Sequence, residues 1–492
     1  MVSLTFIYDI IFLIIFCLTA TIFLYVKRKN IHREGLMFLY KTKVGIKLIN
    51  YIGGKYKRTL WFLSYIIIGL SYILMIGVTY LIGKSVYIYV TKPFLVTSII
   101  KAPPIAPVIP YFPQLFGLES YFPNFSFTYF IVSISIVALV HEFSHGIFMK
   151  YNKVKIKSTG IAFLGPILGA FVEQDEKDME KKGKIAQMSI LGAGVFANIL
   201  TAIIFFMIWW GLFYVSFIPS GAIFDSYAMG VVGVNSIESI NGINITNPTN
   251  QNLINFIDSK KLNDTKVLGL DEDRINFTEI IVNGDSYFIT IDLLKKQLEL
   301  NQSQVIVYYD MPAIRNVIKG TIISIDKSPI NHYKDLGVVL SKYSPGDNVN
   351  IKTRFNGEIK NYNIVMGKNP LNSSKAMMGI GNGRNLKLNM ADNFAPFKKP
   401  FTEYIENGSF LPFIYYLVFW IFLLNLLVAF FNMLPASILD GGRFFYLTVW
   451  GITKNEKIAK KAYKYSGKII LLAFILMIIA WFIGITFGKY FA

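Results

Sequence analysis

His141-Glu142-Phe143-Ser144-His145 lies inside the apolar stretch of residues 127–149, and this combination decides how the chain folds. Helical residues four apart share one face, so the imidazoles of His141 and His145 can reach one Zn²⁺ ion. Glu142, between them, is placed to act as a general base on a metal-bound water. The stretch is long enough to cross a bilayer, where ionisable side chains mark function by default. The pattern therefore predicts a hydrolytic metal site within a membrane.

The composition indicates a membrane protein with several spans. Of 492 residues, 53% are hydrophobic and only 16% are charged, far from the balance of a soluble domain. We expect a polytopic α-helical protein with about six transmembrane helices. They cover residues 4–26, 60–83, 127–149, 185–215, 411–434 and 469–487. The protein therefore has the lipid bilayer as a partner.

The net charge is +19, and the basic residues lie in loops beside the spans, where they set the orientation of a protein in the membrane. Basic residues gather in three regions beside the spans, at residues 27–58, 150–184 and 443–468. A nucleic-acid-binding protein would gather them on one folded face, so no nucleic-acid partner is expected. By the positive-inside rule these regions are cytoplasmic. Both termini, residues 84–126 and residues 216–409 are then outside, and the cell membrane is the expected location.

Residues 216–409 differ in composition from the rest and predict an α+β region outside the membrane. Alternating apolar residues predict strands at Thr321–Ile325, Asn348–Phe355 and Glu358–Val365, with a short helix at residues 333–342. Residues 237–242 resemble residues 322–327, which suggests two related units. The expected organisation is N-terminal spans (1–126), a first core half (127–215), this insert (216–409), a second core half (410–443) and a C-terminal loop and span (444–492).

Two apolar stretches allow more than one interpretation. Residues 161–172 contain several glycines and a proline, and predict either a membrane-dipping strand or loop near the metal motif or an ordinary loop. Residues 86–90 and 94–100 are too short to span, so they lie at the interface or form a re-entrant hairpin.

A catalytic zinc needs a third protein ligand, and Asp440 is the candidate. The charge topology runs the third and fifth spans in the same direction, which places Asp440 near the depth of His141 and His145. The alternative is a helix cap or turn residue before Gly441-Gly442. Cys17 is the single cysteine, so a thiolate metal site is excluded.

Three motifs together resemble the site-2 protease family of intramembrane zinc metalloproteases. They are the His-Glu-x-x-His pentad, Gly194-x-x-x-Asn198, and Asn432-x-x-Pro435 followed by Asp440-Gly441. The resemblance implies one zinc ion on His141, His145 and Asp440, with Glu142 as catalytic acid and base. It also implies that Asn198 and Asn432 bind the substrate, although asparagines can simply hydrogen-bond between helices. The insert resembles the PDZ domains of such proteases.

The expected function is zinc-dependent cleavage of the transmembrane segments of single-span membrane proteins, with the active site towards the cytoplasm. One alternative is a membrane zinc transporter or sensor, which would need further carboxylates in the membrane. Asp9 is the main one, and the sequence gives it no evident partner. The other alternative is a non-catalytic membrane protein that presents PDZ-like domains. The sequence sets no oligomeric state.

Overall fold

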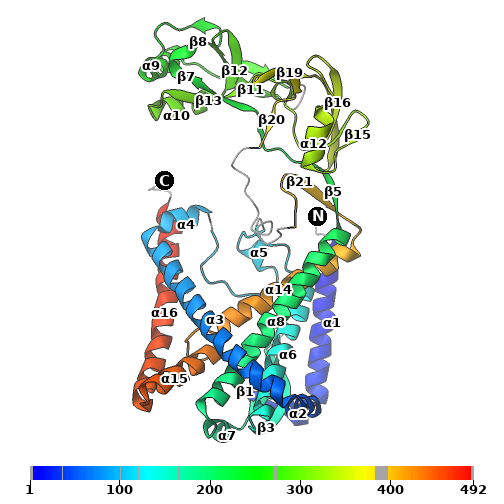
Figure 1. The fold of residues 1–492 in the computed structure, drawn as a ribbon, viewed down its shortest axis with the longest axis vertical. Helices are drawn as coiled ribbons and strands as arrows, with labels where there is room; N and C mark the ends of the chain where they lie inside the picture. The colour runs from blue at the N-terminus through cyan, green and yellow to red at the C-terminus, as the bar shows by residue number, and fades with distance from the viewer. Residues whose placement is uncertain are drawn as a thin grey trace. The chain divides into compact units, whose positions relative to one another are not determined.

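A computed structural model describes residues 4–35, 37–99, 101–119, 121–164, 167–269, 274–382 and 397–488. Its contacts divide the chain into two units. The first consists of Met1–Ser216 and Gly408–Ala492, and the second is Phe217–Asn407. Figure 1 shows long helices in the first unit and short strands and helices in the second.

Six helices among the described residues are long and apolar enough to cross a membrane, which confirms the predicted fold class. They are α1 (Leu4–Val26), α3 (Lys57–Thr91), α6 (Phe127–Tyr151), α8 (Lys184–Ser216), α14 (Phe410–Asn432) and α16 (Glu456–Phe487). One buried cluster joins five helices of the unit, through Ile67, Phe148, Ala193, Ala429 and Phe444. This cluster packs α3, α6, α8 and α14 together around the segment that carries the metal motif.

Helix α6 begins where the sequence supplies a cap. Ser126 is its N-cap, and the Ser126 hydroxyl accepts a hydrogen bond from the Tyr129 backbone N–H at 3.3 Å. At the other end, the backbone N–H and the side-chain amide of Asn152 both donate to the Phe148 carbonyl, at 3.0 and 2.9 Å. The His-Glu-x-x-His pentad therefore lies inside a continuous helix, more than one turn from either end.

Residues 161–172, one of the two ambiguous stretches, belong to a sheet. Strands β3 (Ile156–Leu164) and β4 (Ile167–Gln174) pair in antiparallel fashion, and residues 165 and 166 between them lie outside the described residues. The hairpin β1 (Ile31–Glu34) and β2 (Met37–Thr42) extends it to an antiparallel sheet of order β1-β2-β3-β4. The strand interpretation is thus confirmed, and β4 is left at one edge of the sheet.

Residues 86–90 are not separate from the second span, and their place at the membrane interface stays a prediction. They continue α3, because nothing in Gly83-Lys84-Ser85 breaks the helix strongly enough to end it. Pro93 then starts the short helix α4 (Pro93–Ile99), since proline fits the first turn of a helix; residue 100 lies outside the described residues.

Three further short helices stand at the ends of the long ones. They are α2 (Ile46–Lys55), α7 (Glu176–Glu180) and α15 (Asp440–Thr453). Figure 1 shows α2, α7 and the strand β3 near one end of the long helices. The sequence analysis did not predict α15, which begins at Asp440 itself and continues past residue 443.

The second unit contains two larger sheets, each with its own buried core. Two two-stranded sheets accompany them: β18 (Gly367–Asn369) with β19 (Asn372–Met377), and β6 (Ser226–Tyr227) with β20 (Ile380–Gly381). The first sheet has the order β7-β13-β12-β11-β8-β9 and packs against α9 (Asn250–Lys260) and α10 (Ile291–Glu299). Its strands are β7 (Met229–Gly233), β8 (Ile237–Ile240), β9 (Ile243–Asn244), β11 (Ile275–Val282), β12 (Asp285–Ile289) and β13 (Gln304–Tyr309), and β10 (Lys266–Leu268) pairs with β11.

The second sheet has the order β17-β16-β14-β5-β21. Its strands are β5 (Phe217–Ala222), β14 (Thr321–Ile325), β16 (Asn348–Phe355), β17 (Glu358–Val365) and β21 (Thr402–Glu406), and α12 (Tyr333–Leu340) belongs to the same core. The three strands predicted from alternation are confirmed with the predicted bounds, and the short helix is confirmed but ends at Leu340, two residues before the predicted end. The insert is therefore a mixed α/β region.

Candidate metal centre

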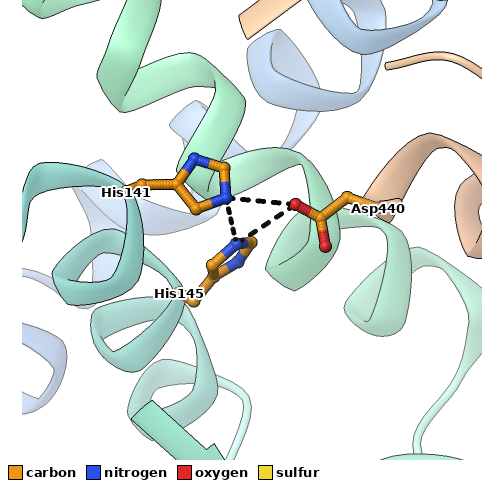
Figure 2. A group of neighbouring side chains, drawn as sticks. All are labelled: His141, His145 and Asp440. Atoms are coloured by element: carbon orange, nitrogen blue, oxygen red, sulfur yellow. Dashed lines mark hydrogen bonds and ion pairs between the residues drawn. The ribbon is translucent and has the colours of Figure 1, made fainter. Parts of the chain in front are cut away.

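His141, His145 and Asp440 meet at one point, as Figure 2 shows. The Nε2 atoms of the two histidines lie 3.0 Å apart. Asp440 Oδ2 lies 3.2 Å from His141 Nε2 and 3.4 Å from His145 Nε2. Ligands of a tetrahedral zinc, bonded at about 2.0–2.2 Å, are about 3.3–3.6 Å apart. The triangle is therefore close to the size of one face of a zinc coordination tetrahedron.

The two histidines come from consecutive turns of α6, and Asp440 comes from the first residue of α15. Both imidazoles are 7% exposed, so few waters compete for their nitrogens. Asp440 reaches them because α14 ends at Asn432 and the chain turns back through residues 433–439. Gly441 makes this return tight: a Cβ there would lie 2.5 Å from the Leu434 carbonyl oxygen.

The hydrogen bond that His145 makes on the side away from the centre fixes the tautomer that a metal needs. Its Nδ1 lies 2.6 Å from the backbone carbonyl oxygen of Ile190. A carbonyl only accepts, so Nδ1 carries the hydrogen and Nε2 keeps its lone pair for the centre. Such a second hydrogen bond is the usual way in which a metal-binding histidine is oriented.

The outer contact of His141 is with Asn198 of α8. Asn198 Nδ2 lies 3.1 Å from His141 Nδ1, while Asn198 Oδ1 is buried without a hydrogen-bond partner in the described structure. Turning the amide by about 180° would bring Oδ1 to His141 Nδ1–H, since the two ends of an amide differ little in shape. That arrangement satisfies the orphaned oxygen and leaves His141 Nε2 free to bind a metal. The donors therefore fit a zinc ion.

Gly194, one turn before Asn198 on α8, makes room for the two imidazoles. A Cβ at this position would lie 2.5 Å from His145 Nε2 and 2.6 Å from His141 Cε1. No side chain larger than hydrogen fits without moving the rings. The Gly-x-x-x-Asn spacing thus serves the metal ligands twice, through the space left by the glycine and the contact made by the asparagine.

The carboxylate of Glu142 is held by the edge strand β4. Its Oε2 accepts a hydrogen bond from the Val172 backbone N–H at 3.1 Å. Glu142 also lines a cavity of about 560 Å³ together with the three candidate ligands. Other residues lining it include Lys157, Glu173, Glu176, Asn432, Ile438 and Leu439. The candidate base therefore faces the same space as the candidate metal site.

The two asparagines expected to bind substrate occupy different places. Asn198 is fully buried at 0% exposure and touches His141, as described above. Asn432 is partly exposed and lines the cavity, with its Nδ2 3.4 Å from His141 Nε2. Only Asn432 is placed where a substrate in the cavity could contact it.

Polar residues at the cavity are tied to the surrounding elements. Glu173 of β4 accepts from the Ser158 hydroxyl at 2.5 Å and from Lys41 Nζ at 2.9 Å. The Ser158 hydrogen bond, followed by that of Lys41, holds the pKa of Glu173 below its ordinary value. Glu176 pairs with Arg443 of α15 at 3.0 Å, three residues beyond Asp440. The contacts of Glu173 thus tie β4 to β2 and β3, and the ion pair of Glu176 ties α7 to α15.

Asp9 has partners, so the expectation that it has none is wrong. Its carboxylate accepts from the Phe127 and Thr128 backbone N–H groups at 2.7 and 2.9 Å, from the Thr128 hydroxyl at 2.7 Å and from the Tyr111 hydroxyl at 2.5 Å. The donors on Phe127 and Thr128 stand at the N-terminus of α6, where a carboxylate is stabilised, and Tyr111 adds a donor from the preceding loop. The sequence could not show them because they lie 102 to 119 residues away.

Sequence reasoning did not find the Ile190 carbonyl, the Val172 N–H or the spatial role of Gly194. Two of these are backbone groups, which leave no signal in the residue type. Gly194 did carry a signal, its spacing from Asn198, but the steric reason for it needs the positions of both imidazoles.

Comparison with known proteins gives two results. The family model of peptidase family M50 matches residues 129–478. A segment of 71 residues is 42% identical to an uncharacterized protein of Methanocaldococcus jannaschii, and this match covers 14% of the chain and 19% of that protein. The chain thus spans about a fifth of that relative's length. The matched range of the family model contains the pentad, Asn198, Asn432 and Asp440.

Proposed function

Because this chain belongs to peptidase family M50, the site-2 protease family, we propose that it is a zinc endopeptidase that cleaves single-span membrane proteins within their transmembrane segments. Family membership makes it a metallopeptidase. The six helices that are long and apolar enough to cross a membrane, among the residues described, support an integral membrane location. The observation that carries the proposal is the meeting of His141, His145 and Asp440 next to Glu142.

Each residue of the site has a distinct task in the proposed reaction. His141, His145 and Asp440 hold Zn²⁺, which when bound supplies Lewis-acid chemistry at the scissile carbonyl. Glu142 takes a proton at its carboxylate from the attacking water and gives it to the leaving nitrogen. Asn432, at the cavity wall, donates its amide to the substrate backbone. Asn198 and the Ile190 carbonyl keep the two imidazoles oriented.

The position of β4 supports binding of the substrate as an extended strand. A helical amide is hydrogen-bonded and shielded, so the segment to be cut must unwind and needs new hydrogen-bond partners. β4 is an edge strand, and the Val172 N–H points from its free edge to Glu142. A peptide added along this edge would lie beside the catalytic carboxylate.

We further propose that the site opens towards the cytoplasm and that the second unit lies outside. The distribution of Lys and Arg along the sequence supports this orientation. The two sheet-and-helix halves of the second unit support PDZ-like modules that act as a size filter, admitting substrates already trimmed outside. Deletion of residues 218–389 should then increase cleavage of full-length substrates relative to trimmed ones. Unchanged selectivity would contradict the filter.

The central test measures cleavage of a single-span substrate by the purified protein in detergent. Wild type should cleave, and both a zinc chelator and Glu142→Gln should abolish cleavage, with a loss of about 10²-fold or more for the variant. Glu180→Gln is the matched control, because Glu180 does not line the zinc cavity. Cleavage that survives both treatments would sink the proposal. Zinc binding without any cleavage would favour a transporter or sensor.

A further inference from the structure

A second cavity of about 450 Å³ lies at the end of α1, beside the β1–β2 hairpin. Its lining includes Leu24, Tyr25, Arg28, Ile31, Arg33 and Phe38. None of its lining residues belongs to the zinc cavity. The cavity combines an apolar wall with two guanidinium groups, so its ligand must have both an apolar and an anionic part.

The two arginines have no carboxylate partner among the residues that the structure describes. The Arg28 guanidinium carbon lies 5.1 Å from the centre of the Tyr25 ring, in a cation–π contact. Arg33 Nε donates to the Gly35 carbonyl at 3.1 Å. A guanidinium has five N–H donors in a planar fork that matches a phosphate, so both side chains retain donors for such a group.

The place of the cavity indicates a membrane interface. The apolar span of α1, Phe6–Val26, ends just before Lys27-Arg28-Lys29. Tyr25, 68% exposed, stands at the level where aromatic residues gather at the boundary of a bilayer. Leu24 and Phe38 extend the apolar lining towards the span. A molecule in this cavity would therefore have its charge at headgroup level and its apolar part beside acyl chains.

We propose that this cavity binds one anionic phospholipid of the surrounding bilayer. The phosphate lies between Arg28 and Arg33, and the first part of an acyl chain lies against Leu24 and Phe38. A basic pocket beside a transmembrane helix is the kind of surface that recognises lipid headgroups. A free phosphate shares the charge but has nothing to place against the apolar wall.

The bound lipid connects two elements that otherwise meet mainly through aromatic rings. Phe23 of α1 contacts Tyr40 of β2 and Phe163 of β3, with ring centres 5.0 and 5.9 Å apart. The cavity lies next to this junction, with α1 on one side and β1 and β2 on the other. The lipid thus holds α1 to the sheet whose other edge strand contacts Glu142.

The test is native mass spectrometry of the full-length protein in detergent, titrated with dioleoyl phosphatidylglycerol or with dioleoyl phosphatidylcholine. Wild type should bind the first phosphatidylglycerol about tenfold more tightly than phosphatidylcholine, because the cationic choline group of phosphatidylcholine offsets its phosphate charge beside the two arginines. Arg28→Gln/Arg33→Gln should remove this preference. The Tm of this double variant in phosphatidylcholine should match that of wild type. If the double variant does not fold, Arg28→Lys/Arg33→Lys replaces it: lysine keeps the charge but lacks the planar fork of donors, so the preference should fall.

Lys27→Gln/Lys29→Gln is the matched control, since it removes two positive charges from the residues on either side of Arg28 without touching the cavity lining. It should keep most of the preference for phosphatidylglycerol. Equal weakening in both double variants would overturn the proposal in favour of general surface attraction. Inorganic phosphate at equal concentration should not displace the lipid; full displacement would also overturn it, because the apolar wall would then contribute nothing.

Discussion

Asp440 and His141 are 299 residues apart in the chain, yet Asp440 Oδ2 lies 3.2 Å from His141 Nε2. The whole second unit separates them in sequence, and α14 and α15 bring them together. A carboxylate at the first residue of a helix can also act in stabilising the helix dipole. Its distance to two imidazoles that already have outer hydrogen-bond partners favours the ligand role.

Asp440→Asn should therefore remove the metal and leave the fold intact. The amide keeps the size of the side chain but is a neutral, weaker ligand. After dialysis against a limiting chelator, wild type should retain about one zinc per chain, and the variant less than about a tenth of this. Elemental analysis by mass spectrometry measures both. Asp285→Asn, in the second unit, is the control, and full zinc content in Asp440→Asn would show that this carboxylate is not a ligand.

Gly194→Ala should disturb the same site through volume alone. Its Cβ would lie 2.5 Å from His145 Nε2, so the rings must separate, and we expect both zinc content and cleavage to fall about tenfold or more. Gly211→Ala, on the same helix, is a matched control because its Cβ meets no atom within 4 Å. Equal zinc content in the two variants would contradict the steric argument.

Asn198 distinguishes orientation of a ligand from binding of substrate. If it accepts a hydrogen bond from His141 Nδ1–H, Asn198→Asp should keep zinc, because a carboxylate also accepts. Asn198→Leu should lower zinc affinity by about 10- to 100-fold, the usual cost of losing an outer-shell partner. Competition with a zinc-binding fluorophore gives the affinity. A substrate-binding role predicts the opposite pattern, with unchanged zinc affinity and a raised KM in both variants.

The sequence predicts those parts of the fold and the site that depend on residues close together in the chain, or on which loops carry the basic residues. His141 and His145 share a face because of helical periodicity, and the strands Thr321–Ile325 and Asn348–Phe355 follow from alternation. Asp440 was found through the distribution of Lys and Arg, which says which loops share a side of the membrane.

The remaining features depend on contacts between distant segments. Helix α15 was missed because Asp440-Gly441-Gly442 is a weak helix start by propensity, and packing of Phe444 and Leu447 into the core outweighs this. The partners of Asp9 come from a loop and from the start of α6. The pairing of β2 with β3 joins residues 38–42 to residues 159–163, and short apolar strands carry no sign of their partner.

Glu173→Gln should destabilise the protein in a pH-dependent way. The folded-state pKa of Glu173 is lowered by the Ser158 hydrogen bond and by Lys41, so protonation favours the unfolded chain. The stability that the carboxylate contributes is present above its ordinary pKa and is lost as pH falls through the folded value. The difference in Tm between wild type and variant should be constant from about pH 8 to about pH 5 and shrink below that.

Thermal unfolding in detergent measures this difference. Glu180→Gln serves as the control, because the Glu180 carboxylate makes no hydrogen bond or ion pair with the residues described. Its Tm should match wild type at every pH. A difference for Glu173→Gln that grows in acid would contradict the assigned direction of the pKa shift.

Ile438 should determine how tightly an apolar substrate binds. Its side chain is 93% exposed, which is unusual for isoleucine, and it lines the zinc cavity two residues before Asp440. The loop that carries it is held by Tyr463, whose hydroxyl donates to the Ser437 carbonyl at 2.6 Å. An exposed, fixed isoleucine beside the scissile position gives a transmembrane substrate an apolar surface to cover.

Burying such a side chain on binding is worth about 1.5–3 kcal/mol, so Ile438→Ser should raise KM about tenfold or more. The value of kcat should change little, because the side chain of Ile438 is a hydrocarbon and can neither bind the metal nor exchange a proton with Glu142. Ile452→Ser is the matched control: Ile452 is 77% exposed on α15 but does not line the cavity. Steady-state kinetics on one single-span substrate compare the three proteins. A fall in kcat at constant KM for Ile438→Ser would contradict this prediction. It would mean that Ile438 holds the ligand Asp440 in place, since a displaced ligand slows the chemical step without weakening substrate binding.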